Sequence, residues 1–298
     1  MDAMSGVGSL FCGESDNYLA DKALEVMQDE EGLSLSRGFD PFERAIQVDR
    51  ASSCELMIQV CFQYLGSLPL ALKAIRMHDS WMNSASGYDL VADAPELVFA
   101  RATAICHLAC VMEGVDAPLE TLASLATSLS VGLHGDEVSQ EDVATEARTL
   151  VLSSNSAPSI ACWISSFCGR FDVATHSKFA GQLQKLEYNA CVMAWLFALD
   201  VPASPDQLPR KTALGSFMLA LLMKCVVQLD ALQPRLLHDE GWSWLLTHLR
   251  AMQHQEDGSA SPPSLDPEIF VPLFELATRT TLEEACADAM AVAAVSCR

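Results

Sequence analysis

Two segments of this 298-residue chain, 95–112 and 210–227, are too apolar to lie at the surface of a helical protein. In the first, Glu96, Arg101 and His107 are the main interruptions to an otherwise apolar run. A helix that is apolar on most of its sides has to be surrounded by other helices. Each segment therefore predicts the central helix of its own helical group.

The rest of the chain supplies helices to surround these two centres. Apolar residues recur at intervals of three and four, which is the period of an amphipathic helix. The predicted helices span 18–28, 49–65, 70–83, 119–129 and 141–152 around the first centre, and 159–168, 178–199, 236–252, 267–280 and 282–295 around the second. Asp49 is expected to cap the helix at 49–65. No segment alternates with the period of a strand, so the sequence predicts an all-α fold.

A break rich in Ser, Asn and Pro at 153–159 divides the two helical groups. The predicted organisation is a flexible arm over 1–17, an N-terminal helix and first five-helix lobe over 18–155, a second five-helix lobe over 156–280, and a C-terminal helix or tail over 281–298. Both groups repeat the same rhythm around one apolar helix. The sequence therefore predicts two tandem lobes of similar structure.

Charge and hydropathy limit the kinds of partner. The chain has 39 acidic and 18 basic residues and a net charge of −21, whereas binding to a phosphate backbone needs clustered Lys and Arg. We therefore expect no nucleic-acid partner and a preference for basic protein surfaces. We also expect no membrane association and no signal peptide, because no run of 18 apolar residues occurs and no basic region precedes an apolar core.

The 11 cysteines include no Cys-x-x-Cys pair, so we expect reduced, buried thiols. Cys106, His107 and Cys110 come closest to a metal-binding set, but they lie inside the first apolar helix. No nucleophile elbow and no glycine-rich phosphate loop occurs in the sequence. The sequence therefore predicts no catalytic residue, no metal and no cofactor, and a protein that is not an enzyme.

The N-terminal arm contains a short candidate docking element. Residues 10–14 read Leu-Phe-Cys-Gly-Glu, and Asp16 follows. In an extended strand the side chains of Leu10, Cys12 and Glu14 point to one side, because strand side chains alternate. A groove on another protein can then bind an apolar anchor, a thiol and a carboxylate in a row, while its backbone pairs with the strand.

Longer stretches resemble the cyclin family. Residues 50–64, which begin with Arg-Ala, resemble the start of a cyclin box, and 78–82, His-Asp-Ser-Trp-Met, stand where the family closes its next helix with Asp-Arg-Phe-Leu. Residues 108–118 resemble the family's Ala-x-Lys-Met-Glu-Glu stretch and the proline that follows it. Residues 156–158 and 200–216 resemble the beginning of the second lobe and the turn into its central helix.

The resemblance covers about residues 18–280. The chain is similar above all to D-type cyclins, notably the plant ones, which also carry Leu-x-Cys-x-Glu near the N-terminus. It implies a regulatory subunit that binds and activates a cyclin-dependent kinase and recruits retinoblastoma-type pocket proteins in G1/S cell-cycle control. It also implies a nuclear and cytoplasmic protein in which Leu10, Cys12 and Glu14 dock the pocket protein.

The resemblance further implies a kinase interface, whose residues in this chain are Arg50, Val111, Met112, Glu113, Ala144 and Glu146. Cyclins hold their kinase partly through a Lys in the central helix of the first lobe and a Glu in the last helix of that lobe. Here Val111 stands at the Lys position. Ala144 stands at the Glu position, unless a gap brings Glu146 there. The ion-pair grip on the kinase is therefore expected to be missing or moved.

Two other functions remain open. Loss of that grip also fits an adaptor with the cyclin fold that no longer activates a kinase. Basal transcription factors share the two-lobe fold, but their DNA-facing surface should be basic and this chain is acidic. Separately, Ser261 precedes Pro262 in an acidic, proline-rich loop, which makes it either a candidate site of proline-directed phosphorylation or part of a plain linker.

Overall fold

The computed structural model describes residues 22–28, 44–82, 97–133, 138–151, 158–201, 208–224, 226–227, 232 and 264–296. Within these ranges every regular element is a helix, and extended backbone pairs only in an isolated bridge between Val227 and Leu265. The described part of the chain is therefore all-α, as the sequence predicted. None of its helices combines the length and the apolarity that crossing a membrane requires.

The chain divides into two compact units. The first comprises residues 29–159 and 198–208, and the second comprises 1–28, 160–197 and 209–298. The change from one unit to the other after residue 159 falls at the end of the predicted Ser/Asn/Pro-rich break.

A short helix over residues 22–28 belongs to the second unit, whereas the sequence grouped it with the first lobe. The reason is visible in its contacts. Leu24 is fully buried, and the Glu25 carboxylate lies 3.6 Å from the guanidinium of Arg279, which is part of the same unit.

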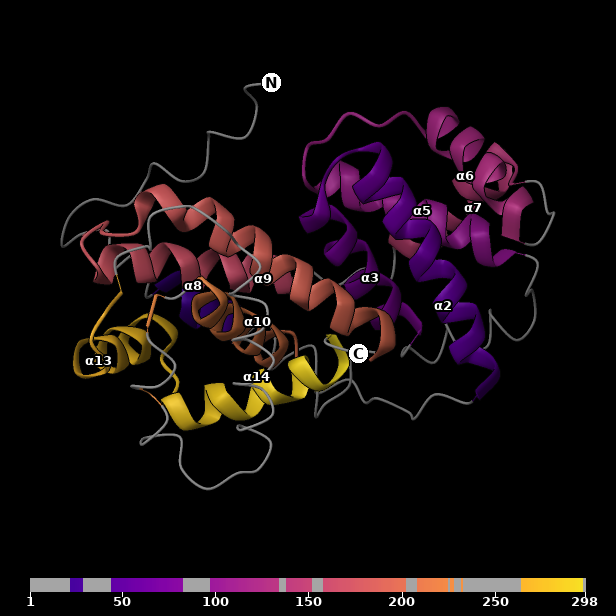
Figure 1. Cartoon of the computed structure of the whole chain (residues 1–298). Coiled ribbons are helices and arrows are strands. Elements are labelled where there is room, and N and C mark those ends of the chain that lie inside the picture. The colour runs from indigo at the N-terminus through magenta and orange to yellow at the C-terminus, as the bar shows by residue number, and fades with distance from the viewer. Residues whose placement is uncertain are drawn as a thin grey trace, which may run out of the picture. The chain divides into compact units, whose positions relative to one another are not determined.

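The first unit is built around α5 (Val98–Met112), which is labelled in Figure 1. Its other described helices are α2 (Arg44–Ile58), a π-helix (Gln59–Tyr64), α3 (Leu68–Met82), α6 (Leu119–Leu133) and α7 (Gln140–Val151). α5 packs against α2, α3, α6 and α7, and its Ala102, Ala104 and Cys106 are fully buried. The prediction of a central helix at 95–112 is confirmed.

The helix predicted at 49–65 differs from the observed one at both ends. Residues 44–48 contain no Gly or Pro, so α2 already includes them, and Asp49 lies inside the helix rather than at its cap. The last part is the π-helix, in which the Leu65 N–H donates to the Val60 carbonyl oxygen at 3.1 Å, five residues back.

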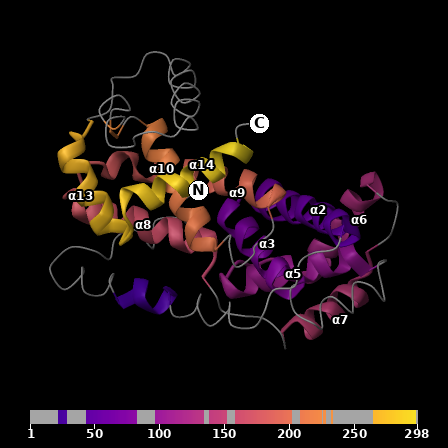
Figure 2. The same ribbon diagram turned by 90° about the horizontal axis from the view of Figure 1, so that it is seen from below.

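The second unit is built around α10 (Pro209–Met223). Its other described long helices are α8 (Ile160–Ala174), α9 (Ala180–Asp200, except residues 198–200), α13 (Pro267–Thr278) and α14 (Leu282–Ser296). α10 packs against α8 and α14, and α8 packs against α13, as Figure 2 shows. Phe217 of α10 lies in the core. The centroid of its ring is 6.0 Å from the ring centroid of Phe167 and 6.2 Å from that of Phe274. The prediction of a central helix is confirmed for residues 210–223, but it was wrong at the C-terminal end, because α10 ends at Met223 and Val227 pairs with Leu265 in the isolated bridge.

Candidate functional site

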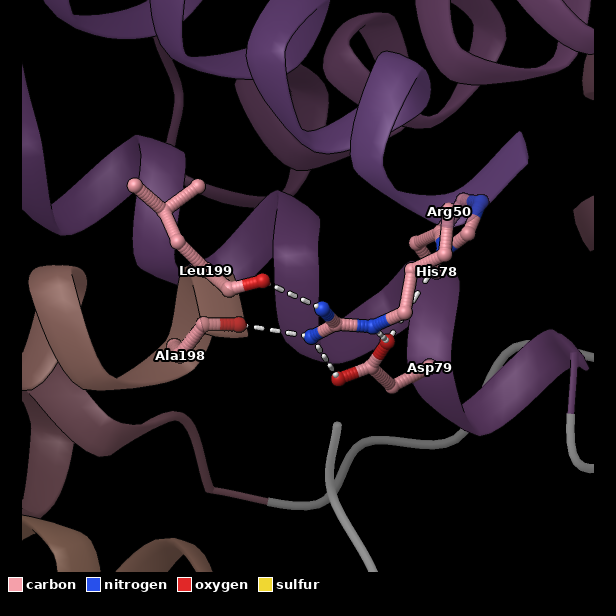
Figure 3. Close-up of polar contacts among 5 residues, drawn as sticks. All are labelled: Arg50, His78, Asp79, Ala198 and Leu199. Carbon is pink, nitrogen blue, oxygen red and sulfur yellow. Dashed lines mark hydrogen bonds and ion pairs between the residues drawn. The ribbon is translucent and has the colours of Figure 1, made fainter. Parts of the chain in front are cut away.

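Arg50 lies at the centre of a buried polar cluster in the first unit (Figure 3). Its Nε and Nη2 donate to the two carboxylate oxygens of Asp79, on α3, at 2.8 and 3.0 Å. Its Nη1 and Nη2 donate to the backbone carbonyls of Leu199 and Ala198 at 2.8 and 2.6 Å. Arg50 is only 3% exposed. It is therefore an internal brace rather than the interface residue that the resemblance implied.

The cluster fixes the charge of both partners. Burial by itself raises the pKa of the Asp79 carboxyl, but Arg50, together with His78, whose Nδ1 lies 3.8 Å from Oδ1 of Asp79, outweighs burial and holds this pKa well below its usual range. Burial likewise lowers the pKa of the Arg50 guanidinium, and Asp79 more than offsets this and raises it. Arg50 and Asp79 are therefore both charged at neutral pH, and the pair joins α2 to α3 inside the unit.

Val111, Met112 and Val115 form an apolar surface at the C-terminal end of α5, which we call the α5 patch. The three residues are 61%, 46% and 37% exposed. Gly114 ends the helix in the left-handed region with φ of 66°. Its N–H donates to the Val111 carbonyl, and the Val115 N–H donates to that of Cys110, at 3.2 and 2.9 Å. These two bonds form a Schellman motif, which holds the patch in one geometry.

A lysine from another helix lies beside the α5 patch. Lys73 of α3 donates through Nζ to the carboxylate of Glu113, the residue that follows α5. The Lys73 side chain is largely covered, whereas that of Glu113 is 47% exposed and stays accessible to a partner. The patch therefore has an ion pair at its edge although Val111 stands where cyclins have Lys. Sequence reasoning missed Lys73, because its place depends on how α3 packs against α5.

Ala144 and Glu146 of α7 are the two candidates for the position at which cyclins have a Glu that contacts the kinase. Neither is an exposed acid. Glu146 is buried, and its Oε2 accepts a hydrogen bond from Nε of Arg101, on α5, at 3.1 Å. The Arg101 guanidinium also lies 5.7 Å from the ring centroid of Trp81. Ala144 is half-buried and carries no charge. Glu146 thus joins α7 to α5 inside the unit, and neither residue supplies an acid to a partner.

Four of the candidate residues, Leu10, Cys12, Glu14 and Ser261, lie outside the described residues. Pocket-protein docking and phosphorylation at these positions stay predictions.

The described cysteines are free thiols, and all except Cys162 are buried. Burial raises the pKa of Cys110 and Cys286 to about 12, so these thiols stay protonated. Among the described residues, no group of three or more His, Cys, Asp or Glu side chains is arranged to hold a metal ion. The buried thiols of this part of the chain therefore contribute packing.

No protein-family model matches the chain, and no curated protein or solved structure shows significant similarity to it. Its functional interpretation therefore rests on its own residues. Taken together, the Arg50–Asp79 brace, the α5 patch and the Lys73–Glu113 pair give a rigid support, an apolar contact surface and an accessible carboxylate. This arrangement is suited to binding another protein.

Proposed function

We propose that this protein is a D-type-cyclin-like regulatory subunit whose two helical units act as cyclin-box lobes. It binds a cyclin-dependent kinase and brings retinoblastoma-type pocket proteins to that kinase for phosphorylation in G1/S control, in the nucleus and the cytoplasm. The observation that carries the proposal is the exposure of Val111 and Met112 at the positions where the resemblance expects the kinase.

The physical chemistry of the α5 patch supports a protein partner. Two adjacent large apolar side chains exposed at a fixed helix end lose contact with water when a partner covers them, which stabilises a complex by about 25 cal/mol per Å² of apolar area. Glu113 at the edge of the patch favours a partner that carries a basic residue next to its apolar contact.

The Arg50–Asp79 brace supports the resemblance itself. Arg50 belongs to the stretch 50–64 and Asp79 to the stretch 78–82, and both stretches are parts of one ungapped resemblance to the start of a cyclin box. The two residues form a buried bidentate pair. Their pairing gives one physical reason for an Arg and an Asp at these two positions of a cyclin-like lobe.

The proposed mechanism is conformational. The α5 patch packs against a mobile helix of the kinase and stabilises the arrangement in which the kinase's own Lys–Glu pair is in place. The protein contributes surface and no reacting group. Residues 10–14 bind the pocket protein and raise its local concentration at the kinase by tethering.

A second function, a cyclin-fold adaptor that binds its partners without activating a kinase, has its own support. Val111 is uncharged where cyclins have Lys, and Glu146 is bonded to Arg101 inside the unit. If the family's charged grip is needed for activation rather than for binding, this chain retains the contact and lacks the activity.

The test is a pull-down from dividing-cell extract with the full chain, followed by immunoblots for cyclin-dependent kinases and for pocket proteins and by a pocket-protein phosphorylation assay. Val111→Glu removes apolar contact and places a second carboxylate near Glu113, so kinase recovery should fall by an order of magnitude or more, or about 2 kcal/mol. Cys12→Ala should lose the pocket protein and keep the kinase.

Leu276→Glu is the matched control for Val111→Glu, because Leu276 is 62% exposed and lies in the other unit. It should keep both partners. Recovered kinase that phosphorylates the pocket protein supports the regulatory subunit, whereas recovered kinase without activity supports the adaptor. If Val111→Glu and Leu276→Glu recover the same amount of kinase as the unaltered chain, the assignment of the α5 patch is wrong.

A further inference from the structure

α13 is apolar around more than half of its circumference, and only part of this apolar surface packs into the core of the second unit. Phe270 and Phe274 are fully buried and Ala277 is 1% exposed, and this face packs towards α8 (gold helix in Figures 1 and 2). A helix that only had to cover the core would be polar on its other side.

The apolar surface of α13 continues beyond the face that packs into the core. Ile269, Pro272, Leu273 and Leu276 recur at i, i+3, i+4 and i+7, so at 100° per residue they share a stripe about 100° wide. Ile269 and Leu276 are 54% and 62% exposed, Pro272 is exposed and Leu273 is half-buried. We call these four residues the α13 stripe. Exposed apolar side chains that share one helix face mark an interaction surface more often than scattered ones do.

Acidic residues follow one edge of the α13 stripe. Glu268 and Glu275 are seven residues apart and therefore lie one above the other beside it. Glu275 is held in place, because its Oε1 accepts a hydrogen bond from the N–H of Leu282 at 3.0 Å. Asp266, whose side chain caps α13, adds a third carboxylate at the start of the helix.

We propose that the α13 stripe binds a cationic amphipathic helix of another protein. The apolar face of the partner helix covers the α13 stripe. Lys or Arg residues along the edge of that partner helix lie opposite Glu268 and Glu275. Helix-on-helix recognition of this kind uses apolar anchors at the same i, i+3, i+4 and i+7 spacing. The acidic edge selects the sign of the partner's charge and speeds its association.

Charge decides against other occupants. A second copy of this chain would bring its own carboxylates to the same surface, where they would repel Glu268 and Glu275. An anionic membrane surface would be repelled by the acidic edge. This site lies in the second unit and does not depend on the kinase proposal.

The test is fluorescence anisotropy of the full chain with a labelled, helix-forming peptide of Leu and Lys whose leucines form one stripe. Two further peptides serve as comparisons, one with Glu in place of Lys and one with the same composition but leucines on all sides. The unaltered chain should bind the striped Lys peptide at least about tenfold more tightly than the other two.

The deciding variant is Ile269→Ser with Leu276→Ser, which leaves the net charge unchanged and touches two largely exposed side chains, so the chain should still fold. It should weaken binding of the striped Lys peptide about tenfold. The matched control, Val111→Ser with Met112→Ser, should leave that binding unchanged.

Equal binding by the Ser variant and the unaltered chain would overturn the proposal, because it would show only general attraction of a cationic peptide to an acidic protein. Equal binding of the Glu peptide would overturn it too. A dimer in light scattering that Leu276→Ser converts to a monomer would assign the α13 stripe to self-association instead, and binding to anionic vesicles that Leu276→Ser removes would assign it to a membrane.

Discussion

Arg50 and Asp79 are 29 residues apart in the chain and form a bidentate ion pair, with donor–acceptor distances of 2.8 and 3.0 Å, in the interior of the first unit. The same guanidinium donates to the carbonyls of Ala198 and Leu199 in the last turn of α9. Such carbonyls have no donor within their own helix. One side chain therefore joins α2 to α3 and also caps the end of α9.

Removing one member of this pair should be strongly destabilising. Asp79→Ala leaves the Arg50 guanidinium buried without its counter-charge, which costs about 3–5 kcal/mol of unfolding free energy. Urea unfolding followed by circular dichroism measures this loss. The double variant Arg50→Met with Asp79→Leu leaves no unpaired charge. Its loss of unfolding free energy should be smaller than the sum of the losses of Arg50→Met alone and Asp79→Leu alone. Additive losses would show that the two residues do not act as a pair.

The pair also predicts how stability depends on pH. The pKa of Asp79 is lower in the folded chain than in the unfolded one, so its contribution is complete above the unfolded value of about 3.9 and is lost as the pH falls through the folded value. Unfolding free energies measured from neutral pH downwards should therefore decrease below about pH 4. In Asp79→Asn this part of the acid dependence should disappear.

Asp288 on α14 should show the opposite sign. Burial raises its pKa to about 6, against the lowering effect of Lys211 and Arg210 and with Glu284 adding to the rise. The folded chain therefore holds a proton that the unfolded chain releases, and this side chain's contribution falls as the pH rises from about 4 to about 6. Because Asp288 is only half-buried, Asp288→Asn should stabilise the protein near neutral pH by about 1 kcal/mol.

The same substitution should have little effect near pH 4, where the folded Asp288 carboxyl is already protonated. Thermal unfolding of Asp288→Asn and the unaltered chain at both pH values makes the comparison. An equal gain at both pH values would indicate an effect of shape or helix propensity rather than of charge.

Apolar periodicity predicted the parts of the fold that local pattern controls. The segments 95–112 and 210–227 contain α5 (98–112) and α10 (209–223, beginning one residue earlier), because a run that is apolar on most sides is stable only in an interior. Pro267 was predicted to start a helix and is the first residue of α13, where its missing N–H costs nothing and the Asp266 side chain caps the turn.

The contacts that define the candidate site could not be predicted in that way. Arg50 and Asp79 are 29 residues apart in the chain, and Arg101 and Glu146 are 45 apart. Each pair therefore forms only because of the way its two helices pack against each other. Glu146 was assigned to an interface by counting positions, which carries no information about burial. The π-helix at 59–64 was missed for a related reason, because a wider turn leaves composition and apolar pattern almost unchanged.

Gly215 shows how closely α10 and α14 approach each other, and it supports a last prediction. A Cβ atom at this position would lie 2.5 Å from the Asp288 carbonyl oxygen and 2.9 Å from the Ala289 nitrogen. Both are backbone atoms, so the clash cannot be relieved by rotating a side chain. Gly215→Ala should therefore force the helices apart and lower the unfolding free energy by about 3 kcal/mol.

Gly169, inside α8, is the matched control, because a Cβ atom there would meet nothing within 4 Å. Gly169→Ala removes the backbone flexibility of glycine from a helix interior without a clash, so it should stabilise the protein by about 1 kcal/mol. Urea unfolding of the two variants should thus give changes of opposite sign. If Gly215→Ala were as stable as Gly169→Ala, α10 and α14 would not be in backbone contact. The packing of α14 against α10 described above would then be wrong.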